Sequence, residues 1–205
     1  LIALVVFAMD FVFQSAMEVI YAFYGLDANK KTVLITGGSL GAGSINKAMV
    51  RWLEKIAGWK NVQVIWQCGS YYHKELEEQL KGRMPENVKF MPFLKRMDLA
   101  YACADLVVAR AGAGTISELC LLGKAAVLVP SPNVAEDHQT KNAMALVNKQ
   151  AAVMVKDAEV VERLGEVMER LLQDDGERKS LSDHILTLAM KNSDEVIARE
   201  ILKIM

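Results

Sequence analysis

Short apolar runs alternate along the chain with segments whose apolar residues recur at helical spacing. Ile45, Met49, Leu53 and Ile56, for example, would lie along one face of a helix. Alternation of this kind is typical of a parallel sheet whose right-handed crossovers place helices on both faces. The sequence therefore predicts an α/β fold, a Rossmann-like doubly wound parallel sheet, with strands at residues 33–36, 62–67, 88–91, 106–109, 126–129 and 153–155.

The two ends of the chain do not show the alternation of strands and helices found in the middle. Helical patterns cover residues 159–172, 175–190 and 193–205, with residues 174–177 as a turn, and we expect residues 26–205 to form one domain. Residues 1–25 begin with nine apolar residues before Asp10, far fewer than the roughly 20 that span a bilayer. No positively charged signal-peptide start precedes them. We interpret residues 1–25 as a linker helix or the stub of a truncation, in preference to a membrane-associating segment.

The most informative segment is Arg110-Ala-Gly-Ala-Gly-Thr-Ile-Ser-Glu118, which joins an apolar strand to a helix expected at residues 115–122. Gly112 and Gly114 allow the main chain to approach an anion closely, and the first helical turn adds unpaired N–H groups and a partial positive charge. Glu118 falls one turn into the helix, where its carboxylate can accept hydrogen bonds from ribose hydroxyls. Taken alone, the same pattern also fits an ordinary tight turn between a strand and a helix.

A second glycine-rich turn follows the strand at residues 33–36 and leads into a helix. Gly37, Gly38 and Gly41 form the candidate phosphate-binding turn, together with Gly112 of the other segment. Ser39 lies at the start of the helix, where its hydroxyl and the neighbouring N–H groups can hold a diphosphate. The turn matches neither the Walker A motif nor the dinucleotide-binding Gly-x-Gly-x-x-Gly motif.

The third segment is Glu136-Asp-His-Gln-Thr-Lys-Asn-Ala143, which follows the strand at residues 126–129 and a loop with two prolines. Polar side chains that both donate and accept hydrogen bonds suit sugar hydroxyls. The alternative is a helix N-cap at Asp137 followed by solvated polar residues.

In their order and spacing, these three segments resemble the carboxyl-terminal, donor-binding half of the MurG family, bacterial glycosyltransferases of the GT-B fold. The resemblance covers roughly residues 26–205. It implies a role for each matched position: Ser39 near the diphosphate, the backbone of Leu94 on the uracil edge, Ala113, Gly114 and Thr115 on the phosphates, Glu118 on the ribose, and His138 and Gln139 on the sugar.

The resemblance also implies an activity. Enzymes of this family transfer N-acetylglucosamine, with inversion, from UDP-N-acetylglucosamine to a lipid-linked muramyl-pentapeptide, converting lipid I to lipid II at the cytoplasmic face of the inner membrane. The motifs of the family's amino-terminal domain, which holds the acceptor site and the general base, do not occur here. We therefore expect these 205 residues to contain no catalytic residue, to bind donor, and to transfer nothing alone. Gly43 stands where the family commonly has Arg.

Two other functions remain open at this stage. One is a non-catalytic sugar-nucleotide-binding subunit of a split glycosyltransferase, and the other is a sugar-nucleotide epimerase of similar architecture. An upstream reading frame continuous with Leu1 would distinguish a truncated enzyme from the first of these. The second would require catalytic carboxylates and a histidine in a cleft between two domains.

Composition narrows the classes of partner. The net charge of −1 gives no basic surface for nucleic acid, so nucleotide binding is expected to be local, through backbone and cavity. No cofactor is expected, and no metal, since no Asp-x-Asp-type cluster lies near the motifs. Cys68, Cys103 and Cys120 form no Cys-x-x-Cys pair and are predicted to be buried thiols. We expect His73 and His184 to be solvated, and the tryptophans to be core or interface residues.

Overall fold

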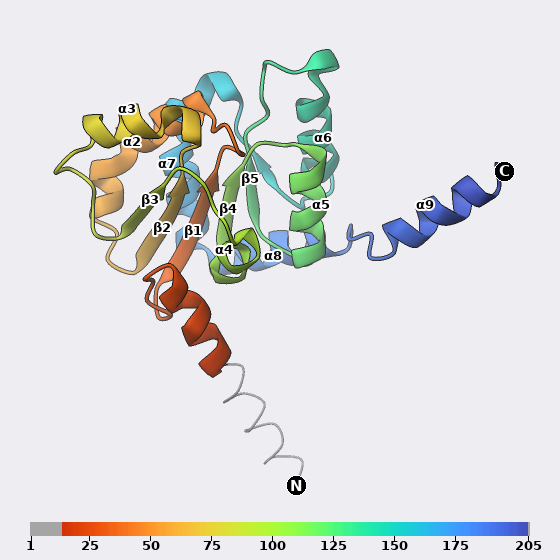
Figure 1. Cartoon of the computed structure of the whole chain (residues 1–205), viewed down its shortest axis with the longest axis horizontal. Helices are drawn as coiled ribbons and strands as arrows, with labels where there is room; N and C mark the ends of the chain where they lie inside the picture. The colour runs from red at the N-terminus through yellow and green to blue at the C-terminus, as the bar shows by residue number, and fades with distance from the viewer. Residues whose placement is uncertain (1–13, 205) are drawn as a thin grey trace, which may run out of the picture.

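The computed structural model describes residues 14–204, whose centre is a six-stranded sheet (Figure 1). Every neighbouring pair of strands is parallel, and the strand order is β3-β2-β1-β4-β5-β6. The predicted doubly wound α/β fold is confirmed, and all six strands lie within two residues of their predicted bounds. The strands are β1 (Lys31–Thr36), β2 (Val62–Gln67), β3 (Val88–Met91), β4 (Leu106–Ala109), β5 (Ala126–Leu128) and β6 (Val153–Met154).

The strand order places β1 and β4 side by side at the centre of the sheet. From this pair, the chain winds outward through β2 and β3 on one side and through β5 and β6 on the other. Thr36 pairs with Ala109, so β1 and β4 end at the same level. Ligands of doubly wound sheets bind at such a switch point, outside the carboxyl ends of the strands.

Helices cover both faces of the sheet, and alternate strand residues face each layer. Val33 and Ile35 belong to one buried cluster, and Leu34, between them, belongs to the other. The first cluster contains residues of α2 (Gly43–Ala57), α3 (Ser70–Gln79) and α7 (Val160–Gln173), and the second contains residues of α4 (Met97–Cys103), α5 (Ala113–Leu122) and α6 (His138–Val147).

The tryptophans and cysteines support this core. Trp66 is fully buried and its indole N–H donates to Asn46 Oδ1 at 3.0 Å. Cys68, Cys103 and Cys120 are all buried and unpaired, as predicted. Burial raises the pKa of both the Cys68 and Cys103 thiols to about 11. A thiol with such a pKa carries little thiolate at neutral pH and therefore reacts slowly.

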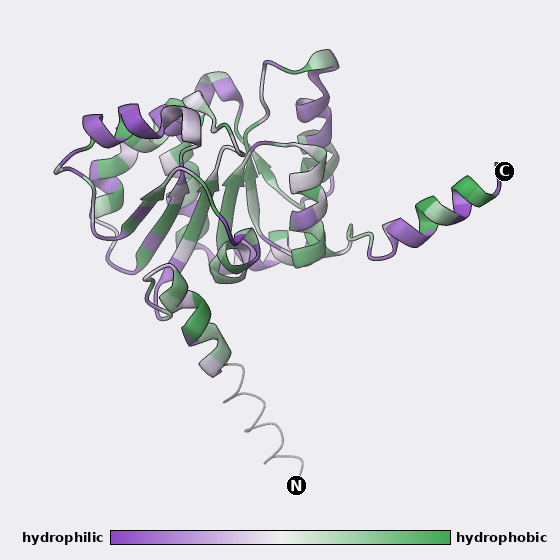
Figure 2. Ribbon diagram, viewed as in Figure 1, coloured by the Kyte–Doolittle hydropathy of each residue, from purple (hydrophilic) through white to green (hydrophobic). Residues whose placement is uncertain are grey.

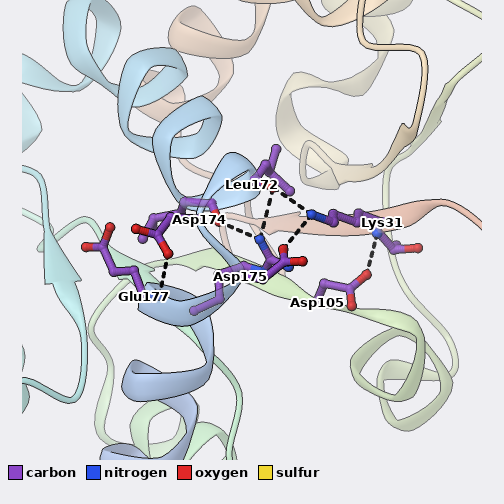
Figure 3. A network of polar contacts seen from close by, with 9 residues as sticks. Lys31, Asp105, Leu172, Asp174, Asp175 and Glu177 are labelled. Atoms are coloured by element: carbon purple, nitrogen blue, oxygen red, sulfur yellow. Dashed lines mark hydrogen bonds and ion pairs between the residues drawn. The ribbon is translucent and has the colours of Figure 1, made fainter.

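At the amino end of the sheet, a polar network ties β1 to the helices that follow the sheet (Figure 3). Lys31 Nζ donates to the Leu172 carbonyl at 2.8 Å and to Asp175 Oδ1 at 2.6 Å. Asp174 Oδ1 accepts from the Glu177 N–H at 2.8 Å. The turn predicted at residues 174–177 is therefore wrong in detail, since this side chain caps the start of α8 (Asp175–Leu186).

The two ends of the described chain extend away from the sheet. Residues 14–23 are helical, and α9 (Ser193–Leu202) projects from the body without a buried residue (Figures 1 and 2). Helix α8 ends four residues before its predicted end at residue 190. Within residues 14–204, no helix combines the length and apolar character that crossing a membrane requires. The expectation for the apolar residues 1–9 lies outside the described residues.

Candidate functional site

Two glycine-rich turns meet at the carboxyl ends of the central strands. Residues 37–42, the first glycine turn, connect β1 to α2, and residues 110–112, the second glycine turn, connect β4 to α5. Because β1 and β4 are adjacent and parallel, both turns lie at the same edge of the sheet (Figure 1). The two candidate phosphate-binding segments are thus brought together at the switch point.

The glycines of the first turn shape it more than they donate to a ligand. Gly38 and Gly41 have φ values of +80° and +86°, a conformation that L side chains rarely adopt. The Gly38 N–H donates to Thr36 Oγ1 at 3.2 Å and the Gly41 N–H to the Gly38 carbonyl at 3.0 Å, so both groups have partners inside the turn. The N–H groups of Ser39 and Leu40 have no acceptor among residues 14–204. They remain open, beside the exposed Ser39 hydroxyl.

The second turn leads directly into an uncapped helix. Helix α5 begins at Ala113, two residues before the predicted start, and its N-cap Gly112 has no side chain to satisfy the first N–H groups. The Ile116 N–H makes the first helical bond, to the Gly112 carbonyl at 3.0 Å. A Cβ added at Gly114 would meet no heavy atom within 4 Å. Packing therefore does not require glycine there, and the space in front of the helix is open.

The Arg110 side chain holds the second glycine turn against α2. Arg110 Nη1 lies 2.5 Å from Asp157 Oδ1 and 3.1 Å from the Val129 carbonyl, and Nη2 donates to Ser44 Oγ at 3.0 Å. The Arg110 and Asp157 side chains are 17% and 22% exposed, so this ion pair is mostly shielded from water. Sequence reasoning missed it, because its partners lie 47 and 66 residues away along the chain.

Glu118 and Leu94 lie on neighbouring elements. Glu118 is exposed on α5, and its Oε2 accepts from the Tyr101 hydroxyl of α4 at 3.0 Å. Burial and the adjacent Glu118 carboxylate raise the pKa of Tyr101, which stays a donor at neutral pH. The side chain of Leu94 is buried in the same cluster as Tyr101. Across the described chain, no hydrogen-bond partner is found for the N–H or carbonyl of Leu94, a residue that is 5% exposed.

His138 and Gln139 are the first two residues of α6. His138 Nδ1 lies 2.9 Å from the Ala135 carbonyl, and a proton shared there leaves Nε2 free as an acceptor. Gln139 Oε1 accepts from the Ser131 N–H at 2.9 Å, which leaves its amide N–H₂ free to donate.

Asp137 is the N-cap residue of α6 by position, but its role differs from the predicted one. Its φ is +51°, and its side chain makes no bond to a backbone N–H of the helix. Instead Asp137 Oδ1 accepts from the Thr140 hydroxyl at 2.7 Å. The preceding Glu136 also has a positive φ, of 53°. Two consecutive left-handed residues without glycine are a strained backbone of the kind that clusters at functional sites.

The structure also shows the surroundings of Gly43, His73 and His184. A Cβ at Gly43, where the family that the chain resembles has Arg, would lie 2.9 Å from the Tyr72 hydroxyl oxygen, so Tyr72 occupies the adjoining space.

His73 is not simply solvated, because its ring stacks on Phe90 with centroids 5.1 Å apart and planes at 10°. His184 is half-buried, with Nδ1 3.1 Å from the Gln150 carbonyl. Within residues 14–204, no group of three or more ligand side chains is arranged to hold a metal ion.

The sequence of residues 32–199 matches the profile of the glycosyltransferase family 28 C-terminal domain. That match covers most of the chain, including both glycine turns and α6. The chain belongs to glycosyltransferase family 28.

A named sequence relative and a solved structure are both similar to this family 28 domain. The chain is 51% identical over 183 residues to a Bacteroides fragilis protein. That protein is named UDP-N-acetylglucosamine–N-acetylmuramyl-(pentapeptide) pyrophosphoryl-undecaprenol N-acetylglucosamine transferase. The match covers 88% of this chain and 48% of that protein. The crystal structure of Acinetobacter baumannii MurG superposes with a TM-score of 0.73 at 30% identity, covering 85% of this chain and 52% of that one. The family 28 domain thus spans about half the length of the relatives that it matches.

A UDP-N-acetylglucosamine 2-epimerase structure also superposes, with a TM-score of 0.57, over 80% of this chain and 39% of that one. Its sequence identity is 17%, so this likeness concerns the fold alone. The similarity of sequence therefore lies with the transferases, and the epimerase interpretation has no support beyond architecture.

Proposed function

We propose that this family 28 domain is the donor-binding half of an inverting N-acetylglucosaminyltransferase that converts lipid I to lipid II in peptidoglycan synthesis. Its ligand is UDP-N-acetylglucosamine. The lipid-linked muramyl-pentapeptide acceptor binds to the part of the protein that these 205 residues do not span. The whole protein works at the cytoplasmic face of the inner membrane, where that acceptor is available.

The observation that carries this proposal is the pair of glycine turns at the switch point. Both lead into helices, α2 and α5, whose N-caps are Ala42 and Gly112 and provide no side-chain cap. Uncapped helix N-termini present N–H groups and a partial positive charge to an anion. A diphosphate seated there has the exposed Ser39 hydroxyl on one side and the first turn of α5 on the other.

The remaining subsites follow from the diphosphate position. The open backbone of Leu94 receives the uracil edge, and Glu118 accepts from the ribose hydroxyls. His138 and Gln139 face the sugar, where the free amide N–H₂ of Gln139 donates to a hydroxyl. Each assignment uses a group whose hydrogen-bonding capacity is still open within the described chain.

In the reaction, the acceptor hydroxyl attacks the anomeric carbon and UDP departs from the opposite face, which inverts that carbon. Negative charge develops on the departing diphosphate. The N–H groups at the start of α5, those of Ser39 and Leu40, and the Ser39 hydroxyl stabilise it without reorganising. One well-oriented donor contributes about 3 kcal/mol to such a transition state. The base that deprotonates the acceptor hydroxyl is supplied from outside these residues.

Nucleotide selectivity tests the proposal. Both glycine turns are indifferent to the base, whereas a backbone edge at Leu94 pairs with uracil. Calorimetric titration of the 205-residue chain is expected to give tighter binding of UDP than of ADP or GDP. Equal affinities for the three diphosphates would overturn the assignment of a uridine nucleotide.

A further inference from the structure

Gln67 is a buried polar residue that no binding role explains. It is the last residue of β2, it is 2% exposed, and its side chain lies between two loops. Its Nε2 donates to the Gly38 carbonyl at 2.8 Å and to the Pro92 carbonyl at 3.0 Å. Its Oε1 accepts from the Thr36 hydroxyl at 2.6 Å.

The neighbours of Gln67 fix the orientation of its amide. Carbonyl oxygens only accept, so the nitrogen must face Gly38 and Pro92, and the oxygen must face Thr36. Thr36 Oγ1 in turn accepts from the Gly38 N–H at 3.2 Å. This closed network satisfies both the N–H and the carbonyl of Gly38, and it leaves the amide no alternative arrangement. A fully satisfied buried network of this kind is rigid.

The two loops that Gln67 joins are different parts of the proposed donor site. Gly38 belongs to the first glycine turn, beside the diphosphate, and Pro92 precedes by two residues Leu94, whose backbone faces the base. One UDP molecule must contact both loops at once. The base contributes fully to affinity only if its loop is correctly placed relative to the turn that binds the diphosphate. A misplaced loop would have to reorganise on binding, which costs affinity.

We propose that Gln67 is a positioning residue that sets the separation between the phosphate-binding turn and the base-reading loop, and so determines uridine selectivity. This inference rests on the proposed function. Gln67 touches no ligand itself. It acts on selectivity because the loop that distinguishes bases is held in register with the turn that binds every nucleoside diphosphate.

The same strand provides a matched control. Gln63 is 4% exposed at the other end of β2, and its Nε2 donates to the Asp27 carbonyl at 2.8 Å and to Thr32 Oγ1 at 3.0 Å. Gln63 therefore has the same side chain, the same burial and the same number of donated bonds as Gln67. It differs in donating to one carbonyl and one hydroxyl rather than to two carbonyls, and in lying at the amino end of the sheet, away from the donor site.

The test compares Gln67→Glu with Gln63→Glu in the 205-residue chain at pH 8. In each variant, a carboxylate of nearly the same shape replaces the amide. It cannot donate, and it faces the two oxygen atoms that accepted from the amide. We expect both variants to lower the melting temperature. Only Gln67→Glu is expected to lower the ratio of UDP to ADP affinity, by about tenfold, which is the equivalent of one net hydrogen bond. Calorimetry gives the two affinities, and circular dichroism verifies folding.

Thr36→Val serves as a second variant that keeps the shape of the side chain and removes the hydroxyl that donates to Gln67 and accepts from the Gly38 N–H. We expect it to lower the selectivity ratio by about threefold, and it decides the matter if Gln67→Glu does not fold. A selectivity ratio unchanged in the folded variants, or lowered equally by Gln63→Glu, overturns the positioning role while leaving the proposed function intact. Equal affinity of the unaltered chain for UDP and ADP overturns both.

Discussion

Two of the side chains assigned to the ligand, Glu118 and Gln139, are each held by a hydrogen bond to another residue. The Tyr101 hydroxyl holds Glu118, and the Ser131 N–H holds Gln139. In both pairs, the partner takes up only part of the hydrogen-bonding capacity of the side chain, because a carboxylate or carbonyl oxygen has further lone pairs. The remaining capacity is therefore oriented before a ligand arrives, which reduces the entropy lost on binding.

Replacing Glu118 by Gln tests its contact with the ribose. Gln keeps the shape and one acceptor but loses the charge, so UDP affinity is expected to fall by about 10- to 100-fold, the loss of a hydrogen bond to a charged group, roughly 1.5 to 3 kcal/mol. Glu166→Gln, on exposed α7 surface, is the control and is expected to have no effect. Unchanged UDP affinity in a folded Glu118→Gln chain would show that Glu118 serves only α5.

Tyr101→Phe separates contact from orientation. The variant keeps the ring in the core and leaves the Glu118 carboxylate free to rotate, so we expect a smaller loss of UDP affinity, about threefold. Titration calorimetry measures it. A loss as large as that of Glu118→Gln would mean that Tyr101, rather than Glu118, makes the decisive contact.

Glu118 and Gln139 were proposed as ligand-binding residues from sequence because they lie inside motifs. Gln67 and Tyr101 were not, because what they do depends on partners 25 to 31 and 17 residues away. The available signal for Gln67 was weak: it and Gln63 are the polar residues of a strand that is otherwise apolar and entirely buried. Such residues have to be hydrogen-bonded, but sequence alone does not name the partners.

At the scale of elements, the glycines of the two turns serve different purposes. A Cβ at Gly41 would lie 2.0 Å from the Cys68 carbonyl oxygen, because the turns after β1 and β2 pack against each other there. Gly114 has no such neighbour and has ordinary helical geometry. Gly41 is therefore required by the fold, whereas at Gly114 the structure leaves room for a ligand.

This difference predicts opposite effects of alanine. Gly41→Ala is expected to destabilise the fold by about 2 to 5 kcal/mol, from the positive φ and the overlap. Gly114→Ala is expected to stabilise α5 by up to about 1 kcal/mol and to weaken UDP binding about tenfold, because the new methyl group occupies the space of the phosphate. Denaturant unfolding and calorimetry measure the two quantities.

Gly176 gives a matched control, since it is the second residue of α8 as Gly114 is of α5. Gly176→Ala is expected to leave UDP affinity unchanged. If Gly114→Ala also leaves it unchanged, the start of α5 is not a phosphate site.

Elements with a strong period were predicted closely, and their ends were not. All six strands are apolar runs bounded by turn residues, which the pattern marks directly. Helix α5 begins two residues before its predicted start, because Ala113 and Gly114 already adopt helical geometry. Neither residue is a typical helix N-cap, so the sequence does not mark this start. Helix α8 begins at its predicted residue, Asp175, where the Asp174 side chain accepts from the Glu177 N–H, but it ends four residues before its predicted end.

For the whole molecule, the position of the site relative to the sheet decides the function. The polar network of Lys31 and Asp175 closes the amino end, and the open N–H groups gather at the carboxyl end. A net charge of −1 gives no long-range field that would collect nucleotides. We therefore expect nucleotide binding to depend largely on backbone donors within a few residues of β1 and β4, so the backbone amides are good reporters of it.

The most direct test of this account follows the backbone amides by nuclear magnetic resonance while UDP is added to the 205-residue chain. We predict that the largest chemical-shift changes fall on residues 39–41, 94 and 113–115. Thr32 and Asp105, joined at the amino end of the sheet by a hydrogen bond of 2.7 Å, are predicted to stay unchanged. Saturable binding of UDP that leaves both glycine turns unchanged, or that shifts the amino end instead, would contradict it.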